Sequence, residues 1–570
     1  MNGYKELDSD ILIIGSGGAG LRAAIEAGAN GASVVVVSKS LLGKAHTVMA
    51  EGGIAASLGD VDSKDSWEVH FSDTIIEGVF LGNWRMAEIL AKEAPERVYE
   101  LERYGALFDR TPEGKIMQRA FGAHTYRRLC HVGDKTGLEL IRTLEDRILH
   151  MNNISVMDET LITKIVSKDN KVIGAIGFEM KTGKFVVFNT KSVIIATGGL
   201  GRIYKITSNS WESTGDGIAL AFKAGAKLVD MEMIQFHPTG MVWPPGVKGL
   251  LVTEGVRGEG GILLNSKGER FMLRYSPKKK ELDARDVVAR AIYNEIKNGN
   301  GTEHGGVYLD ITHKGAAFIK KKLPAMYEQF KEFAGIDITK EKMEVAPTVH
   351  YFMGGILVDA ETCKTNIEGL YAAGETAGGL HGANRLGGNS LADILVFGRR
   401  AGLYASEYIK NAKAGKIGVR EIEAEIDNVK KYIDNKNKGV NPYEMTDKLR
   451  NAMEEYVGII RNEKDLKTAL DIVYKLKKES AKCKVSGDMK FNKGFIECIE
   501  LNNMLLLAEC MIKSALERKE SRGAHTRSDY PEKSSDWEVN IICNNVNGDI
   551  ILESAAIPEI PERLKKILKQ

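Results

Sequence analysis

A glycine motif near the start of the chain has the spacing that binds a dinucleotide. Residues 15–20 read GSGGAG, which matches the pattern G-x-G-x-x-G. The first glycine of this pattern permits a tight turn, the second lets the backbone approach a pyrophosphate, and the third allows a helix to pack closely on a strand. A helix N-terminus at this turn would add partial positive charge. The sequence therefore predicts a dinucleotide cradled by Gly15, Gly17, Gly18 and Gly20.

The residues around this motif predict the elements that must position it. A buried strand precedes it in DILII, an alanine-rich helix follows in LRAAIEAGAN, and a second strand of β-branched residues follows in GASVVVV. This strand–helix–strand order is the context that the glycine pattern requires, and we expect the unit to be right-handed. The acidic residue that usually binds a ribose after the second strand is absent, and Ser38 and Lys39 occupy its place.

Two further glycine-rich segments argue against a chance match. The segment KSVIIATGGLG at 191–201 ends a strand and can return the chain toward the cofactor, and EGLYAAGETAGG at 368–379 can bring Glu375 close to it. A flavin-binding fold needs glycine segments at these points, so we interpret the dinucleotide as FAD. Asp216 in STGDG is a further polar contact or, alternatively, a turn or helix-capping residue.

Length and composition narrow the class of protein. A chain of 570 residues is too long for one hydrophobic core. Its 79 basic and 77 acidic residues leave a net charge of only +2, which argues against a nucleic-acid-binding protein. No apolar run approaches the roughly 18–20 residues of a membrane helix, and no signal peptide is expected before the glycine motif. The six cysteines form no C-x-x-C motif, so we expect no metal site and a reducing cytoplasm.

Nine ordered motifs carry a resemblance to a known family. They read LLGKAHTVMAEGGIAAS, STGDGIALA, QFHPTG, TEGVRGEGG, ARDVVARAI, HYFMGGI, GLYAAGE, HGANRLGGNSL and SRGAHTRSDYP. Over almost its whole length the chain resembles the flavoprotein subunit of succinate dehydrogenase and fumarate reductase. The resemblance implies an FAD-dependent oxidoreductase that interconverts succinate and fumarate by hydride transfer.

The resemblance also implies a domain organisation, which agrees with changes in composition and hydrophobic pattern along the chain. We expect an α/β fold in which a Rossmann-like FAD-binding domain contains an inserted α+β capping domain. A helical domain and a small β-containing C-terminal tail should follow. The FAD-binding domain is assigned to 1–239 and 346–405, the capping domain to 240–345, the helical domain to 406–525 and the C-terminal segment to 526–570.

His46, in KAHTVMAEGG, matches the family histidine that carries FAD covalently through the flavin 8α carbon. Without the motif, a lone histidine would more often be a structural residue. A covalent tether would keep the flavin bound through repeated redox cycles, and substitution at 8α is expected to raise its potential. The other FAD contacts that the resemblance implies are Ser38, Lys39, Thr47, Gly52, Gly53, Asp216, Glu375, Ser390 and Leu391.

The substrate residues implied by the resemblance suit a ligand with two carboxylates. They are His237 in FHPTG, Thr253 in VTEG, His350 in VHYFMGG and Arg385 in GANRLGG. Arginine can bind a carboxylate through two parallel hydrogen bonds, which lysine does less well. Threonine and histidine can complete the clamp and hold the substrate carbons beside the flavin.

A proton must also be exchanged with the substrate, and the family pattern assigns this step to Arg285 in DARDVVARAI. An arginine acid is unusual because its pKa lies above about 12, but the transient carbanion is itself very basic. Glu254 and Arg257 would resupply the proton. Arg290 is the competing donor, with a salt bridge as its alternative role, and Asp286 is expected to orient Arg285.

One apparent redox centre implies that electrons leave through a partner. In the family, an iron–sulfur subunit docks on the flavoprotein and a membrane anchor passes electrons to a quinone. We therefore expect a cytoplasmic chain on the inner face of the cell membrane. The absence of C-x-x-C-H and of an export signal argues against the periplasmic haem-containing fumarate reductases. Glu51, as a carboxylate near the flavin, favours fumarate reduction unless a neighbour or a proton neutralises it.

Two other functions remain as alternatives. L-aspartate oxidase shares the fold and the substrate clamp but lacks the flavin-linking histidine, so His46 argues against it. A catalytically silent flavin-binding scaffold is the alternative from another class, and the set formed by His237, His350, Arg385 and Arg285 argues against that.

Overall fold

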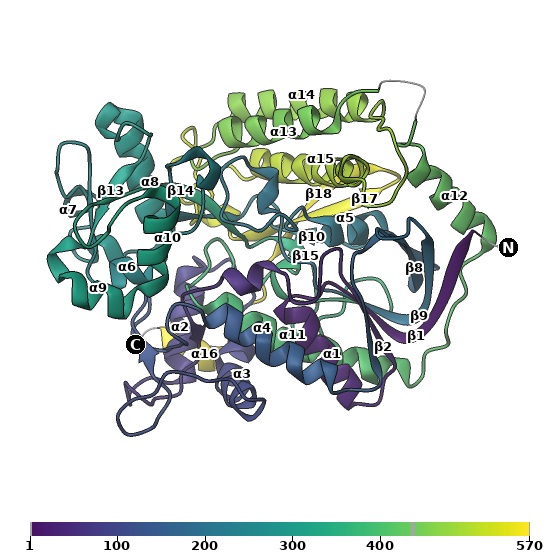
Figure 1. Cartoon of the computed structure of the whole chain (residues 1–570), viewed down its shortest axis with the longest axis horizontal. Coiled ribbons are helices and arrows are strands. Elements are labelled where there is room, and N and C mark those ends of the chain that lie inside the picture. The colour runs from purple at the N-terminus through teal and green to yellow at the C-terminus, as the bar shows by residue number, and fades with distance from the viewer. Residues whose placement is uncertain (1–2, 435–438, 569–570) are drawn as a thin grey trace.

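A seven-stranded sheet carries the glycine motif at one end of its first strand. The computed structural model describes residues 3–434 and 439–568 (Figure 1). Strand β1 (Tyr4–Ile14) pairs in parallel with β2 (Val34–Val37) on one side and with β9 (Phe185–Ile195) on the other. The strand order is β6-β2-β1-β9-β8-β7, and β16 (Leu370–Ala372) pairs in parallel with β9. The remaining strands are β6 (Ile154–Met157), β7 (Thr160–Lys168) and β8 (Lys171–Glu179).

The core strands of this sheet are apolar on both faces because helices cover them. All four residues of β2 are buried valines, as expected of a parallel strand inside an α/β domain. Helix α1 (Gly18–Ala29) packs against α4 (Thr136–Leu149) and the long α11 (Asn389–Ile409), which also contacts α3 (Trp84–Arg103). The predicted α/β class is confirmed. The remaining short elements here are α2 (Trp67–Glu77), α5 (Asp216–Lys223), β3 (Ile54–Ala55), β4 (Gln118–Arg119) and β5 (Leu129–Cys130).

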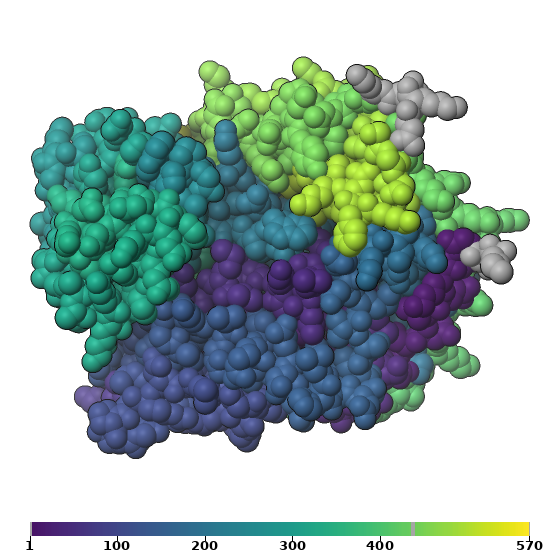
Figure 2. All heavy atoms as spheres, viewed as in Figure 1, coloured from purple at the N-terminus to yellow at the C-terminus, as the bar shows by residue number. Residues whose placement is uncertain are grey.

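Part of the chain before β16 builds a lobe with its own hydrophobic core, which consists of buried residues between Met241 and Val345. Its antiparallel sheet has the order β11-β14-β13-β12. Because Ile234 of β11 pairs with Phe352 of β14, these two strands also connect the lobe to the rest of the molecule. The separate core supports the proposed capping domain, and Figure 2 shows it as a rounded lobe. Its elements are β11 (Ile234–Met241), β12 (Ile262–Leu264), β13 (Val307–Asp310), β14 (Met343–Phe352), α6 (Gly255–Gly258), α7 (Met272–Tyr275), α8 (Arg285–Glu295), α9 (Ala316–Lys322) and α10 (Pro324–Ala334).

The C-terminal region is helical, as its apolar spacing predicted. Helices α13 (Pro442–Tyr456), α14 (Glu463–Ser480) and α15 (Lys493–Glu517) pack together above the sheet domain (Figure 1). An asparagine side chain caps the first turn of each of the three, which stabilises a helix start. These caps are Asn441, Asn462 and Asn492, and α12 (Val419–Lys430) precedes them.

A hairpin of β17 (Val539–Val546) and β18 (Asp549–Ala556) follows and joins β10 (Leu228–Val229) and β15 (Gly355–Ile356) in a sheet. The strands predicted in the C-terminal tail are thus present, and α16 (Glu562–Leu568) then packs on α2. Among the described residues, no helix has the length and apolar character needed to cross a membrane. Within 3–434 and 439–568, no group of three or more His, Cys, Asp or Glu side chains could hold a metal ion.

Candidate active site

One elongated cavity brings the predicted site residues together. It runs from the glycine turn, past the loop after β2, to residues of the capping domain. Two predicted site residues, Gly20 and Arg257, do not line the cavity. The lining residues among the predicted set are Gly15, Gly17, Gly18, Ser38, Lys39, His46, Thr47, Gly52, Gly53, Asp216, His237, Thr253, Glu254, Arg285, His350, Glu375, Arg385, Ser390 and Leu391.

The glycine turn has the geometry that a pyrophosphate needs. Gly15 has φ of +112°, and a Cβ there would lie 2.2 Å from the carbonyl oxygen of Ala196. A Cβ on Gly20 would lie 1.9 Å from the carbonyl oxygen of Gly15, so only glycine lets α1 approach the strand this closely. The Gly18 amide at the start of α1 donates to Thr47 Oγ1 over 3.3 Å, and no acidic residue occupies the first turn of this helix. Gly17, Gly18 and Ala19 line the cavity, so the N-terminal end of α1 faces it with the positive end of the helix dipole.

Lys39 takes the place of the usual ribose-binding acid and forms a buried ion cluster. Its Nζ lies 2.7 Å from Asp216 Oδ2 and 2.7 Å from Glu500 Oε1, while Asn503 donates to Asp216 Oδ1 over 2.9 Å. Burial alone would lower the pKa of Lys39, but the two carboxylates raise it above its ordinary value. Asp216 both begins α5 and lines the cavity, so its two alternative roles are compatible. Glu500 and Asn503 join α15 to this end of the cavity.

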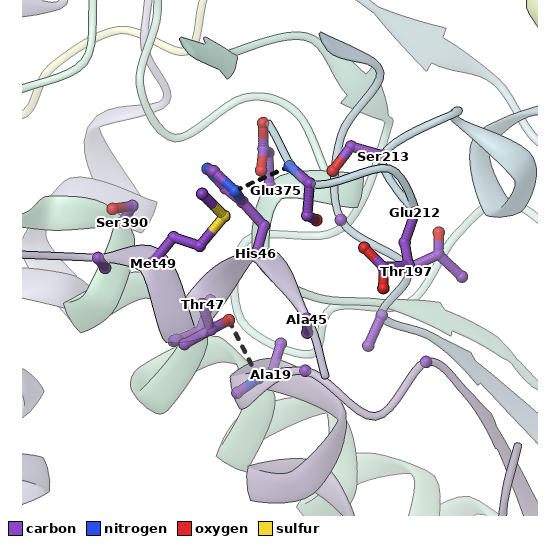
Figure 3. A pocket seen from close by; sticks show the side chains of 18 of the residues that line it. Ala19, Ala45, His46, Thr47, Met49, Thr197, Glu212, Ser213, Glu375 and Ser390 are labelled. Atoms are coloured by element: carbon purple, nitrogen blue, oxygen red, sulfur yellow. Dashed lines mark hydrogen bonds between the residues drawn. The ribbon is translucent and has the colours of Figure 1, made fainter. Parts of the chain in front are cut away.

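His46 begins the short 3-10 helix His46–Met49 and projects into the cavity beside Met49 (Figure 3). The backbone amide of Ser210 donates to its Nδ1 over 3.3 Å, and the Asn209 amide nitrogen lies 3.3 Å from its Nε2. Burial, aided by the charge of Arg385, lowers the pKa of His46 to about 4. The ring is therefore neutral at pH 7, and an unprotonated ring nitrogen is what a bond to the flavin 8α carbon requires.

The histidines of the predicted clamp lie next to His46. The ring centroids of His237 and His350 are 5.1 Å apart, and those of His46 and His350 are 6.3 Å apart. Both clamp histidines are next to irregularities in the pairing of β11 with β14, because Gln235 pairs with Tyr351 while the next residue of β11 pairs two positions back. His350 is thus an extra residue, and such bulges redirect side chains near active sites. Burial holds the pKa of both clamp histidines well below the ordinary value, so both are neutral.

Arg385 is the cation of the predicted clamp. Its guanidinium lies 4.3 Å from the centroid of the Tyr351 ring, and its Nη1 donates to Ser390 Oγ over 3.1 Å. Its buried Nε has no hydrogen-bond partner among the described residues. Burial, aided by the nearby charge of Arg285, lowers the pKa of Arg385 to about 9, so the side chain is still cationic at pH 7. A charged donor without a protein partner fits a bound carboxylate.

Arg285, Glu254 and Arg257 form a continuous buried row that ends at the cavity. Arg285 Nε donates to Glu254 Oε2 over 2.9 Å, and Arg257 Nη2 lies 3.6 Å from the same oxygen. The amide of Gly122 donates to the other carboxylate oxygen over 2.9 Å. Burial alone would raise the pKa of Glu254, but the charges of Arg257 and Arg285 lower it, so this carboxylate is ionised. Arg285 and Glu254 are thus hydrogen-bonded, whereas Arg257 and Glu254 form an ion pair without a hydrogen bond.

The expectation that Asp286 orients Arg285 is wrong. The Asp286 carboxylate lies 2.8 Å from Arg290 Nη2 and accepts from Asn384 Nδ2 over 3.0 Å. Neighbouring residues on a helix point in different directions, whereas residues four apart lie side by side. Arg290 therefore has the salt-bridge role that was its alternative, and its Nη1 also donates to the carbonyl oxygen of Gly523 over 2.8 Å.

Glu77 is connected to this salt bridge through Asn384, and its pKa provides a test of the effect of burial. Asn384 Nδ2 donates to Glu77 Oε1 over 2.7 Å. Burial, aided by the charges of Asp286 and Glu254, raises the pKa of Glu77 to about 8, from an ordinary value near 4.5. The group is thus protonated in the folded chain while it ionises in the unfolded chain. Its contribution to stability is complete below pH 4.5 and is lost as the pH rises to 8.

Glu77→Gln should therefore become more stable than the wild type as the pH rises from 4.5 to 8. The amide resembles the protonated acid but cannot ionise in the unfolded state, so the difference in unfolding free energy should grow by roughly a few kcal/mol. Urea unfolding of both proteins at pH 5, 6.5 and 8 measures it. A difference that stays constant across this range would contradict the raised pKa.

Glu51 also has a raised pKa, which bears on the expected direction of the reaction. Burial, aided by the charge of Asp134, raises its pKa to about 8. The side chain lines the cavity, and its Oε2 is buried without a hydrogen-bond partner among the described residues. The negative charge that would favour fumarate reduction is therefore absent at pH 7, and the direction of the reaction stays a prediction. The alternative, a neutralised Glu51, holds.

Glu51→Gln should accordingly leave the flavin midpoint potential unchanged below about pH 7. Above pH 8 the wild-type carboxyl ionises and lowers the potential, so the variant should then have the more positive value. Spectroelectrochemical titration of both proteins at pH 6.5 and pH 9 measures the two potentials. Equal differences at both pH values would contradict this account.

Several residues of the site were not predicted from the sequence. Gln235 accepts hydrogen bonds from both Arg285 and Arg385, and the Phe121 ring lies 5.8 Å from the Arg285 guanidinium. The sequence position of Gln235 could have placed it in the site. It stands two positions before His237, and alternate residues of a strand share a face. The loop that holds His46, including Asn209 and Ser210, had no comparable signal. The same is true of Phe121.

Comparisons with known proteins agree with this site. A family model described as "FAD binding domain" matches residues 10–391, and one described as "Fumarate reductase flavoprotein C-term" matches residues 446–556. A fumarate reductase (CoM/CoB) subunit of Methanothermobacter marburgensis is 49% identical over 540 residues, or 94% of this chain and 97% of the relative. The succinate dehydrogenase flavoprotein subunit of Coxiella burnetii is 41% identical over 94% of each chain.

A solved structure supports the same assignment. Mycobacterium smegmatis Sdh1 in complex with UQ1 superposes with a TM-score of 0.89 and 52% sequence identity. The match covers 98% of this chain and 96% of that one. The fold, the FAD-binding domain and these full-length relatives all agree. The chain belongs to the family of succinate dehydrogenase and fumarate reductase flavoprotein subunits.

Proposed function

We propose that this chain interconverts succinate and fumarate with FAD and exchanges the electrons with an iron–sulfur partner subunit. The observation that carries the proposal is the single cavity that runs from the glycine turn, past His46, to Arg385 and Arg285. A dinucleotide laid along it would place its flavin between the tethering histidine and the dicarboxylate clamp. No other described cavity combines these groups.

The protein residues have distinct tasks in the proposed reaction. The cationic Arg385, with Thr253, His237 and His350, binds the two carboxylates and fixes the central carbons. Burial of these side chains excludes water, which strengthens their electrostatic interactions. Bound FAD would donate or accept the hydride at one central carbon. In fumarate reduction, Arg285 gives a proton to the neighbouring carbon.

Arg285 must then regain that proton, and the buried row supplies the route. The ionised Glu254 carboxylate bonds directly to Arg285 and lies 3.6 Å from Arg257, so it can pass a proton from one guanidinium to the other. Fumarate, one hydride and one proton give succinate, and oxidation of succinate reverses each step. The same row thus serves both directions.

The cofactor residues are proposed on the same grounds. The α1 N-terminus would hold the pyrophosphate, the Lys39–Asp216 pair lies where the ribose is expected, and Glu375 approaches from the strand end at β16. A covalent bond at His46 is part of the proposal. It agrees with the neutral imidazole in the cavity.

The six cysteines of this chain are all free and buried and form no cluster-binding motif, so the flavin is its one proposed redox centre. We propose an iron–sulfur subunit, which in turn binds a membrane anchor that places the chain at the cytoplasmic face of the membrane. The relatives' names point to two kinds of final electron partner. One is named for CoM and CoB, and another is described in complex with UQ1.

The test is direct turnover of the FAD-loaded chain with artificial redox dyes, which removes the need for the partner. Succinate should reduce an acceptor dye, and fumarate should oxidise a reduced viologen dye. Turnover of L-aspartate without succinate or fumarate turnover would favour the oxidase alternative. Absence of all three activities in a flavin-loaded protein would favour the silent scaffold.

A further inference from the structure

Gln235 joins two arginines for which separate roles are proposed. Its Oε1 accepts from Arg285 Nη1 over 3.0 Å and from Arg385 Nη2 over 3.1 Å. The side chain is completely buried, with 0% of its surface exposed. The proton donor and the carboxylate-binding cation therefore share one neutral acceptor.

The orientation of this amide is determined by its other end. Gln235 Nε2 donates to Asn384 Oδ1 over 2.8 Å and to the Arg385 carbonyl oxygen over 2.8 Å. Both of these atoms can only accept, so the nitrogen must face them and the oxygen must face the arginines. Asn384 is held in turn by its own bonds to Glu77 and Asp286. The amide thus makes four hydrogen bonds within a buried network, and these fix its orientation.

The contact also crosses the boundary of the proposed capping domain. Arg285 begins α8, which belongs to that domain, whereas Arg385 lies in the loop before α11 of the FAD-binding domain. Gln235 stands on β11, one of the two strands that connect the lobe to the rest. Both bonds to its oxygen can form only when the lobe lies against the FAD-binding domain as it does here.

Charge explains why a neutral acceptor suits this position. Two guanidinium groups near each other repel, and a carbonyl oxygen between them offsets part of that repulsion without cancelling either charge. A carboxylate at the same position would form an ion pair with both arginines. It would then compete with the substrate carboxylates for the same donors.

We infer that Gln235 is a positioning residue that holds Arg285 and Arg385 in register while leaving both charges available to the dicarboxylate. The inference rests on the proposed function, which it deepens by assigning the selectivity for a dianion to a neutral bridge. It predicts different effects for a charged and for an apolar replacement.

The test compares Gln235→Glu and Gln235→Met with the wild type, each as the FAD-loaded chain. Fumarate reduction with reduced viologen gives kcat and KM, and the flavin absorbance change gives the Kd of malonate, a dicarboxylate that cannot be desaturated. Gln235→Glu should raise both KM and the malonate Kd by roughly 10–100-fold, because the new carboxylate competes for the arginines. Gln235→Met should mainly lower kcat, because Arg285 loses its second anchor.

Gln118→Glu is the matched control. Gln118 is also buried, but its amide bonds to the Ala56 carbonyl oxygen and the Asp60 amide, and to neither arginine. This variant should keep the KM, kcat and malonate Kd of the wild type even where its melting temperature falls. Flavin content and melting temperature of every variant are measured alongside.

Three outcomes distinguish the hypotheses. Values of KM, kcat and malonate Kd within about twofold of the wild type in both Gln235 variants would overturn the inference. Equal kinetic losses in Gln118→Glu would overturn it as well, since the effect would then be general destabilisation. If the wild type itself turns over neither fumarate nor succinate, the proposed function fails, and malonate binding alone then decides whether Gln235 tunes an anion site.

Discussion

Arg285→Ala should abolish succinate–fumarate turnover while leaving flavin bound. The variant removes the proposed proton donor at the end of the buried row, and a general acid contributes roughly 10²–10⁴-fold to rate. Since Arg285 also bonds to Glu254 and Gln235, both of those groups would face an empty space. Dye-linked assays in both directions, with flavin measured from its absorbance, check the result.

Arg290→Gln is the control for this experiment. Arg290 lies on the same helix and was the competing proton donor, but its guanidinium bonds to Asp286 and to the carbonyl oxygen of Gly523. This variant should keep turnover within about an order of magnitude. Full turnover in Arg285→Ala, or loss of turnover in Arg290→Gln alone, would contradict the assignment of Arg285 as the proton donor.

His46→Ser should remove all covalently attached flavin. Acid precipitation of the wild type should leave a yellow polypeptide, whereas the variant should release its flavin completely into the supernatant. Because substitution at the 8α carbon is expected to raise the flavin potential, the variant should also lose succinate oxidation more than fumarate reduction. Visible spectra of pellet and supernatant, with dye assays in both directions, measure these effects.

Thr47→Ala provides a matched control for the tether. Thr47 is the next residue of the same 3-10 helix, and its hydroxyl accepts from the Gly18 amide over 3.3 Å. The variant should weaken flavin binding slightly but keep the covalent colour. A wild-type pellet without colour would show that this chain binds FAD without a bond to His46.

The features predicted from the sequence were those that depend on local spacing. The glycine turn, its flanking strands and the helical C-terminal region follow from patterns within a few residues. Gln235 escaped prediction because its role depends on two arginines that lie 50 and 150 positions away. The role predicted for Asp286 was wrong because residues adjacent in sequence were taken to be in contact. On a helix these differ.

The charge predicted for Glu51 differs from the structure for another reason. Whether a carboxyl group is ionised depends on how deeply it is buried and which charges surround it, and neither is visible in a motif. Burial and Asp134 together raise the pKa of Glu51 to about 8, which no local pattern indicates. The same reasoning applies to Arg385, whose pKa is lowered to about 9 by burial and by the charge of Arg285.

The pairing of β16 with β9 has a consequence for how the chain is made. Its register places Leu370 beside Val193 and Ala372 beside Ile195, so the central sheet stays incomplete until the ribosome has added residues 196–372. The capping domain is synthesised within that interval and has a hydrophobic core of its own. Domains tend to fold as units during synthesis, whereas pairings between distant strands form slowly. This lobe is therefore expected to be folded before the sheet of the FAD-binding domain is closed.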